Sequence, residues 1–202
     1  KAKKKENMKV KNGLIMKNKG KFTTRKCKKM NIPFIYISRM IKEKKLEKID
    51  RGIYISNDGD LDDYYFFQNK YKKSIYSYQS ALYLHKITDR IPYKIEVTMY
   101  KGYNPHSMKK NDIEIHFVDK KYFYLGLTEV ETAYGNKVRV YDKERTICDL
   151  IKHRNDIDEE IFRKAIYMYL ACNDKNLSNL YEYANIMKIQ KKLDDLMVLA
   201  NG

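Results

Sequence analysis

The segment Asp112-Ile113-Glu114-Ile115-His116 is the part of this sequence that comes closest to a catalytic pattern. Metal-dependent nucleases hold two carboxylates and a lysine on neighbouring strand positions, where the carboxylates bind the metal ion. Here a histidine stands where the lysine is required. Asp112 and Glu114 also alternate with isoleucines, which is the pattern of a strand with one face in solvent. We therefore interpret the two carboxylates as an exposed face and keep a metal-dependent nuclease, or another DNA-processing protein, as the alternative.

The rest of the chain contains no recognisable cofactor or metal motif. Its four histidines lack metal-ligand spacing, and there is no P-loop, no dinucleotide-binding glycine pattern and no Gly-x-Ser-x-Gly elbow. The three cysteines lie far apart in the sequence, as free thiols in a reducing cytosol do. No apolar run approaches the roughly 20 residues of a membrane span. We therefore predict a cytoplasmic protein with no enzymatic activity, cofactor, metal site or membrane partner.

The net charge of +16 is concentrated near the N-terminal end. Residues 1–55 carry 19 Lys and Arg against 4 Asp and Glu, so the chain totals of 42 and 26 leave 23 against 22 for residues 56–202. A strongly basic segment before a balanced one indicates that the first segment binds a polyanion and the second has another task. The sequence thus predicts two domains, residues 1–55 and residues 56–202. The balance of the second domain argues against a purely electrostatic partner for it.

The basic segment carries the signals of three short helices. The first is expected over residues 10–17, and Thr23 or Thr24 is placed to cap the second, over residues 25–30. Pro33 suits the first turn of the third helix, over residues 33–44. Four side chains of this third helix recur at helical spacing and form a stripe that is expected to face the core. They are Ile37, Met40, Ile41 and Lys44.

Two strands are expected next, over residues 46–49 and 53–55, joined by the glycine-containing turn at residues 50–52. Three helices followed by a β-hairpin are the order of a winged helix-turn-helix, whose third helix enters the major groove while the hairpin contacts phosphates. Phe34 and Ile35 face outward on that helix, where they contact either thymine methyl groups or the second domain. The residues expected to contact DNA are Thr24, Arg25, Lys26, Phe34, Ile35, Tyr36, Ser38, Arg39, Lys42, Lys45, Lys48 and Arg51.

The second domain is expected to contain strands in the middle of the chain and helices after them. Strand periodicity covers residues 94–99, 112–118, 127–134 and 137–141, with a hairpin turn at Gly135-Asn136. Helices are expected over residues 61–72, 78–85, 142–154, 158–170, 177–187 and 189–199. Their caps are Asp60, Ser77, Asp142 and either Asp156 or Asp158. This pattern predicts an α+β fold with a mainly antiparallel sheet and C-terminal helices. Arg145 and Asp149, four residues apart, are expected to form a surface salt bridge.

Four stretches of the chain, between about residue 20 and residue 200, resemble the AbiEi family of antitoxins from type IV abortive-infection (phage-defence) toxin–antitoxin systems. The first runs from Met30-Asn31-Ile32-Pro33 to the hairpin at residues 46–55. The second joins Ser80-Ala81-Leu82 to Thr88-Asp89-Arg90-Ile91-Pro92. The third covers residues 140–150, and the last covers residues 177–184.

The resemblance implies a DNA-binding repressor that is also an antitoxin. Its winged helix-turn-helix is expected to repress its own operon by binding double-stranded promoter DNA at inverted repeats. Its C-terminal domain is expected to neutralise a nucleotidyltransferase-like toxin without a stable complex, although direct toxin binding stays open as an alternative. Polar residues in the family-like stretches are candidates for the antitoxin function or, alternatively, caps and salt bridges; they are Ser80, His85, Asp89, Arg145 and Asp149.

The sequence departs from the family in the turns around the third helix. Many members have glycine just before and just after that helix, where this chain has Asn31 and Lys45. A left-handed backbone at either position has to be adopted by a residue with a Cβ atom, which is unfavourable for lysine. We therefore expect the helix ends to be shifted by about one residue.

Overall fold

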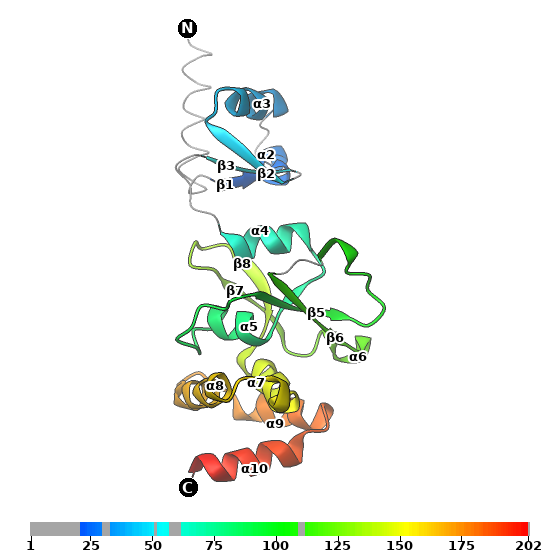
Figure 1. Ribbon diagram of the computed structural model, residues 1–202, viewed down its shortest axis with the longest axis vertical. Coiled ribbons are helices and arrows are strands. Elements are labelled where there is room, and N and C mark those ends of the chain that lie inside the picture. The colour runs from blue at the N-terminus through cyan, green and yellow to red at the C-terminus, as the bar shows by residue number, and fades with distance from the viewer. Residues whose placement is uncertain (1–20, 30–32, 51, 57–61, 109–111, 202) are drawn as a thin grey trace. The chain divides into compact units, whose positions relative to one another are not determined.

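The computed structural model describes residues 21–29, 33–50, 52–56, 62–108 and 112–201. The chain divides into two compact units, Lys1–Phe66 and Phe67–Gly202. The boundary expected from the charge distribution, between residues 55 and 56, lies within the last strand of the first unit (Figure 1). None of the described helices has both the length and the apolar character that a membrane span needs. Each unit is described by itself below.

Between residues 21 and 56, the described part of the first unit forms two helices and a three-stranded antiparallel sheet. Its elements in chain order are β1 (Lys21–Thr23), α2 (Thr24–Lys29), α3 (Phe34–Lys42), β2 (Leu46–Asp50) and β3 (Ile53–Ser56). The strand order is β1-β3-β2, so β1 lies against the far edge of the β2–β3 hairpin. The two helices and the hairpin are confirmed, whereas β1 was not predicted. The helix expected over residues 10–17 lies outside the described residues.

The core of the first unit is small and forms where α3 packs against the hairpin. Its buried side chains are Cys27, Ile37, Met40, Leu46 and Tyr54, with Ile41 half-buried beside them. The stripe predicted on α3 is therefore confirmed for its apolar members. Lys44 does not belong to it, because α3 ends at Lys42 and Lys44 is exposed.

The C-terminal end of α3 shows where the left-handed residue lies. Lys44 has φ 52, its amide donates to the Ile41 carbonyl, and the Lys45 amide donates to the Met40 carbonyl at 2.9 Å. This pair of bonds is a Schellman motif, which normally places glycine at the left-handed position. The left-handed residue is therefore Lys44 and not Lys45, which agrees with the expected shift of the helix end by about one residue. Asn31 lies outside the described residues.

The second unit is built on a five-stranded mixed sheet. Its strands are β4 (Ile75–Tyr76), β5 (Ile95–Tyr100), β6 (Ile113–Val118), β7 (Leu127–Glu131) and β8 (Lys137–Tyr141), in the order β6-β5-β4-β8-β7. The β4/β5 and β7/β8 pairs are antiparallel, but β5/β6 and β4/β8 are parallel. The expectation of a mainly antiparallel sheet thus fails for half of these pairs. A long connection between β5 and β6 returns the chain to the same end of the sheet, which makes the parallel pairing possible.

Helices cover both faces of this sheet. One face carries the buried side chains Tyr76, Val97, Met99, Val138 and Val140. Phe67, in the C-terminal half of α4 (Asp63–Lys70), packs there against Tyr76 with ring centroids 5.9 Å apart. The opposite face carries polar side chains of β5 and lies under α5 (Tyr78–Leu84) and α6 (Lys120–Phe123). Figure 1 shows α4 and α5 on opposite sides of the strands. The α+β class is confirmed.

The C-terminal helices surround α7 (Lys143–Lys152). They are α8 (Glu159–Ala171), α9 (Leu177–Ile186) and α10 (Gln190–Asn201), and they enclose the largest apolar cluster of the described residues together with α5 and α7. Two short 3-10 turns, His106–Met108 and Arg154–Asp156, lie in connections. These helices agree with the predicted ranges to within a few residues.

The helix caps follow the sequence in part. The carboxylates of Asp142 and Asp158 accept backbone amide hydrogens at the starts of α7 and α8, as predicted. Ser77 precedes α5, but its hydroxyl accepts a bond from the Thr98 hydroxyl instead of capping the helix. At α4 the cap is Asp62, which accepts from the Tyr65 amide, and the predicted Asp60 lies outside the described residues.

The same Schellman ending recurs at α9, where it provides a stability test. Lys188 has φ 58 and is exposed, and the amides of Lys188 and Ile189 donate to the carbonyls of Asn185 and Ala184. Because glycine adopts this backbone without a Cβ clash, Lys188→Gly is expected to raise the free energy of unfolding by about 0.5–1 kcal/mol. Urea denaturation measures the change. The control is Lys191→Gly, in the exposed first turn of α10, which is expected to lower the free energy of unfolding by about as much. A change of the same sign and size in both variants would contradict the prediction.

Candidate nucleic-acid interface and the buried centre of the second unit

The outward face of α3 presents both apolar and cationic side chains. Phe34 and Ile35 are 56% and 66% exposed, and Arg39 and Lys42 are also exposed. Ile35, Arg39 and Lys42 lie three or four residues apart, so they share one face of the helix. Tyr36 and Ser38 are half-buried at the edges of this face. Because Ile37 and Met40 anchor the opposite face in the core, α3 is held with this mixed surface toward solvent.

The start of α2 is tied to the turn of the β2–β3 hairpin. The Thr24 amide and hydroxyl both donate to the Gly52 carbonyl, at 2.8 and 3.2 Å. Gly52 has φ +77, and a Cβ atom there would lie 2.9 Å from the Thr24 hydroxyl oxygen. Thr24 was predicted to contact DNA, and the structure places it half-buried with its hydroxyl bonded inside the unit. It therefore positions the hairpin relative to the helices.

The remaining predicted DNA contacts lie on α2 and around the hairpin. Arg25 is exposed on α2, and Lys26 belongs to the same helix. Lys48 is exposed on β2, whereas the Lys45 ammonium lies 2.8 Å from the Glu43 carboxylate. Arg51 lies outside the described residues. Within the described part of the unit, Arg39 and Lys42 have no carboxylate partner, so their charges remain available to an anion.

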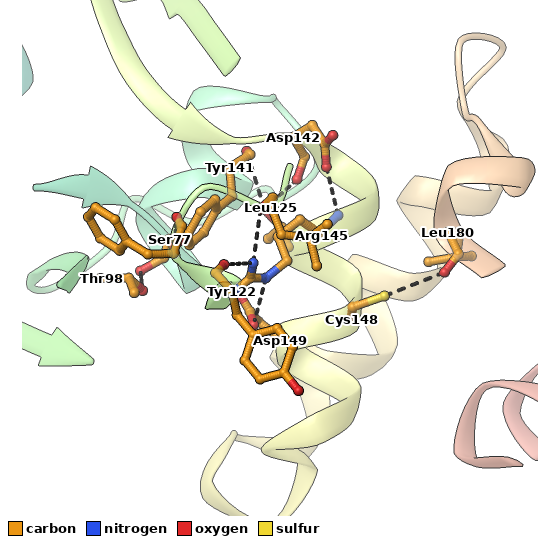
Figure 2. Close-up of polar contacts among 12 residues, drawn as sticks. Ser77, Thr98, Tyr122, Leu125, Tyr141, Asp142, Arg145, Cys148, Asp149 and Leu180 are labelled. Atoms are coloured by element: carbon orange, nitrogen blue, oxygen red, sulfur yellow. Dashed lines mark hydrogen bonds and ion pairs between the residues drawn. The ribbon is translucent and has the colours of Figure 1, made fainter. Parts of the chain in front are cut away.

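In the second unit, Arg145 is a buried anchor at the centre of a polar network. Its side chain is fully buried, and its Nη1 donates to the carbonyls of Tyr122 and Leu125, at 2.7 and 2.9 Å (Figure 2). Its Nε donates to Asp149 at 3.1 Å, and the guanidinium lies 4.3 Å from the centre of the Tyr141 ring. The prediction of a surface salt bridge is therefore wrong: the pair exists, but the loop after α6 and the sheet enclose it.

The Arg145–Asp149 pair is shielded from water. Asp149 is 3% exposed, and burial raises its pKa while the Arg145 guanidinium opposes that shift. In the described residues, the buried side-chain nitrogen and oxygen atoms without a hydrogen-bond partner are Arg145 Nη2 and Asp149 Oδ2. A bidentate pair would also join these two atoms, but here the arm from Nε to Oδ1 is the one that is made. Removing either partner would leave the other charge buried, which is strongly destabilising in proteins.

The loop after α6, which carries the Leu125 carbonyl that Arg145 holds, approaches α7 very closely. The Asp142 amide donates to the Gly126 carbonyl at 2.7 Å, and Gly126 has φ +72. A Cβ atom at Gly126 would lie 2.4 Å from the Arg145 Cβ. Only glycine fits here, both for its backbone conformation and for the space. Gly126 was not among the residues predicted from the sequence to matter, although a glycine directly before a strand is the signal that marks it.

The other candidate antitoxin residues are also bound within the fold. The Ser80 hydroxyl accepts a bond from the buried Glu96 amide at 2.8 Å. His85 Nε2 lies 2.7 Å from the Tyr141 carbonyl and must carry the proton, since a carbonyl only accepts; burial lowers the pKa of this histidine. Asp89 is exposed and lies 2.8 Å from the Lys164 ammonium. Each therefore has a partner within the unit, as caps and structural salt bridges do.

The carboxylates considered for nuclease chemistry are not assembled into a site. Asp112 is exposed before β6, and the Glu114 carboxylate lies 3.5 Å from the Lys94 ammonium. His116 instead lies 2.9 Å from the buried Glu96 and stacks on the Tyr78 ring. In the described part of the chain, no group of three or more His, Cys, Asp or Glu side chains is arranged to hold a metal ion.

Comparison with known families assigns the N-terminal region. Residues 14–57 match the family model of a transcriptional regulator, AbiEi antitoxin. This region is similar to AbiEi antitoxin regulators. The match covers α2, α3 and the β2–β3 hairpin, so it includes the elements that expose Arg39 and Lys42. The predicted resemblance to AbiEi antitoxins is thus confirmed over residues 14–57. No curated protein matches the chain significantly.

A pair of glycines tests the close approach at Gly126. Gly126 and Gly135 have nearly the same φ, +72 and +76, but a Cβ at Gly135 would meet nothing within 4 Å. Gly135→Ala is therefore expected to cost only the strain of the left-handed backbone, about 1–2 kcal/mol. Gly126→Ala is expected to cost about 1–3 kcal/mol more, because the methyl group collides with α7. Urea unfolding of the two variants measures the difference, and equal costs would show that the loop can move away.

Proposed function

We propose that this chain is the antitoxin of a type IV toxin–antitoxin system and a cytoplasmic repressor of its own operon. The N-terminal unit binds double-stranded promoter DNA at inverted repeats, and the rest of the chain neutralises a nucleotidyltransferase-like toxin. The observation that carries the proposal is the match of residues 14–57 to AbiEi antitoxin regulators. It falls on the segment in which the positive charge is concentrated.

The exposed face of α3 suits a helix that enters the major groove. Arg39 can donate two hydrogen bonds to a guanine edge, and Lys42 can contact a base or a phosphate. Ile35 and Phe34 are exposed next to them and can contact thymine methyl groups. Arg25 and Lys48, on α2 and β2, are exposed cations that can hold the flanking phosphates. The wing is kept in place by the bonds from Thr24 to Gly52.

The antitoxin function is assigned to the second unit by its place outside the matched segment. Its family-like residues Ser80, His85, Arg145 and Asp149 support the fold from inside, so a toxin-directed surface is to be sought among exposed side chains. Asp89 is the exposed member of the candidate set.

Promoter binding is tested by fluorescence anisotropy with a labelled duplex from upstream of the gene. Arg39→Ala and Lys42→Ala are each expected to weaken binding by about 1–3 kcal/mol if the side chain contacts a base, and then to reduce discrimination against scrambled DNA. A phosphate contact would weaken both duplexes alike. Arg163→Ala and Lys191→Ala remove the same charges from exposed sites on α8 and α10 and serve as controls. If the Arg39→Ala and Lys42→Ala variants bind the promoter duplex as tightly as the two control variants do, the assignment of α3 as the DNA-contacting helix is contradicted.

Neutralisation is tested by coexpression with a nucleotidyltransferase-like toxin encoded next to the gene. The chain is expected to restore growth, and an Arg39→Ala/Lys42→Ala variant is expected to restore it equally, because α3 serves DNA and not the toxin. Gel filtration of the mixed proteins is expected to show separate peaks. Co-elution would instead support direct toxin binding, and unrelieved toxicity with normal antitoxin levels would contradict the antitoxin assignment.

A further inference from the structure

The second unit contains a pocket of about 350 Å³ that the proposed function does not use. Its aromatic lining is Tyr100, Phe123 and Tyr124, together with the apolar side chains of Ile75 and Leu127. Its cationic lining is Lys72, Lys73, Lys120 and Arg139, and among the described residues no carboxylate lines it. Such a combination of rings and positive charges suits a ligand that has both a flat ring and an anionic group.

The cations of the pocket are held near one another without neutralising partners. The ammonium groups of Lys73 and Lys120 lie 6.0 and 5.3 Å from the centre of the same Tyr100 ring. Within the described residues, none of the four cations has an ion pair with a carboxylate, although Glu129 lies opposite Arg139 in the β7/β8 register. The four cations line one pocket and like charges repel one another, so an anion that enters the pocket is favoured.

The fold also fixes the backbone segments that carry three of these cations, Lys72, Lys73 and Arg139. The buried Gln68 side chain bonds to both backbone groups of Arg139, accepting from its amide at 2.6 Å and donating to its carbonyl at 2.8 Å. It also donates to the Ser74 carbonyl. The Lys72–Lys73 turn, directly before Ser74, is thereby tied to the strand that carries Arg139. A site that is already formed loses less entropy when it binds.

The aromatic part of the pocket has a buried floor and an exposed rim. Phe123 is 3% exposed and packs with Ile75 and Tyr141 beneath the pocket. Tyr124 is 70% exposed at the rim, and its ring centroid lies 4.9 Å from that of Phe123. An exposed ring beside cations is the arrangement on which an unpaired base stacks while its phosphate meets the positive charges. A base in a duplex cannot do so, because both of its faces are covered by neighbouring base pairs.

We propose that this pocket binds one nucleotide unit of a single-stranded nucleic acid, with the base stacked on Tyr124 and the phosphate held by Lys72, Lys73 and Arg139. This site is separate from the duplex-binding surface proposed for α3. The shared chemistry of base and phosphate occurs in both RNA and single-stranded DNA, so both are probes in the test.

The test is fluorescence anisotropy of the full chain with labelled ten-nucleotide oligo(U) and oligo(dT). Tyr124→Ala is expected to weaken binding about 5- to 150-fold through lost stacking. Tyr167→Ala removes a ring that is 76% exposed on α8 and is the matched control, expected to leave the affinity unchanged. A stronger effect with one oligonucleotide identifies RNA or DNA as the preferred strand.

The cations are tested by the salt dependence of the same binding. Lys72→Ala/Lys73→Ala is expected to reduce the slope of log affinity against log salt by about 0.7, because the two lysines hold one phosphate and each phosphate neutralised on a single strand contributes about 0.7. Lys191→Ala/Lys192→Ala removes the same charge from exposed positions of α10 and is expected to leave the slope unchanged.

Several results would overturn the proposal. One is equal affinity of Tyr124→Ala and Tyr167→Ala, and another is equal slopes for the two lysine pairs. A uridine monophosphate that displaces the oligonucleotide at an equal molar concentration would indicate a free-nucleotide site instead. Equal losses of promoter-duplex binding in the pocket variants would indicate a phosphate track for duplex DNA. If Arg39→Ala loses promoter binding while the pocket variants keep it, the result concerns the duplex-binding role of α3 and not the pocket.

Discussion

The buried ion pair of Arg145 and Asp149 is the constraint on which the second unit depends. A guanidinium removed from water is stable only if its hydrogen bonds and its charge are matched by fixed partners. Arg145 finds them in a carboxylate one helical turn away, in one carbonyl group of α6 and one of the loop after it, and in the face of Tyr141. One side chain thereby joins α7, that loop and β8. Any arrangement that separates these elements would expose an unmatched buried charge.

The same anchor shapes the cationic pocket. The carbonyl groups that Arg145 holds belong to Tyr122 and Leu125, and these residues flank the two rings Phe123 and Tyr124. The Tyr141 hydroxyl donates to the carbonyl of Phe123 between them, at 2.8 Å. The backbone around these rings is thus bonded to α7 on both sides and to the end of β8 in the middle. A residue with no exposed surface can therefore control the geometry of an open site, by fixing the backbone of the loop that lines it.

Local patterns predicted most of the elements, and non-local pairing explains most of what was missed. The α3 stripe, the hairpin around Gly52 and the caps at Asp142 and Asp158 are set by neighbours in the sequence, so they could be found there. β1 has three residues and exists only because it pairs with β3, which follows it by about thirty residues. The i, i+4 spacing of Arg145 and Asp149 is the same on a surface and in a core. The burial of this ion pair depends on the loop at Gly126, which is distant in sequence and covers it.

The balanced charge of residues 56–202 is unevenly distributed in space. Several of its carboxylates are committed to ion pairs away from the pocket, for example Asp119 with Lys101 and Asp174 with Lys143. Lys72, Lys120 and Arg139 have no such partner among the described residues and line one pocket together. A region with a net charge of +1 therefore contains a strongly positive site, because opposite charges cancel in the sum but not in space. An anionic ligand responds to the local potential within about a Debye length, roughly 8–10 Å, and not to the total.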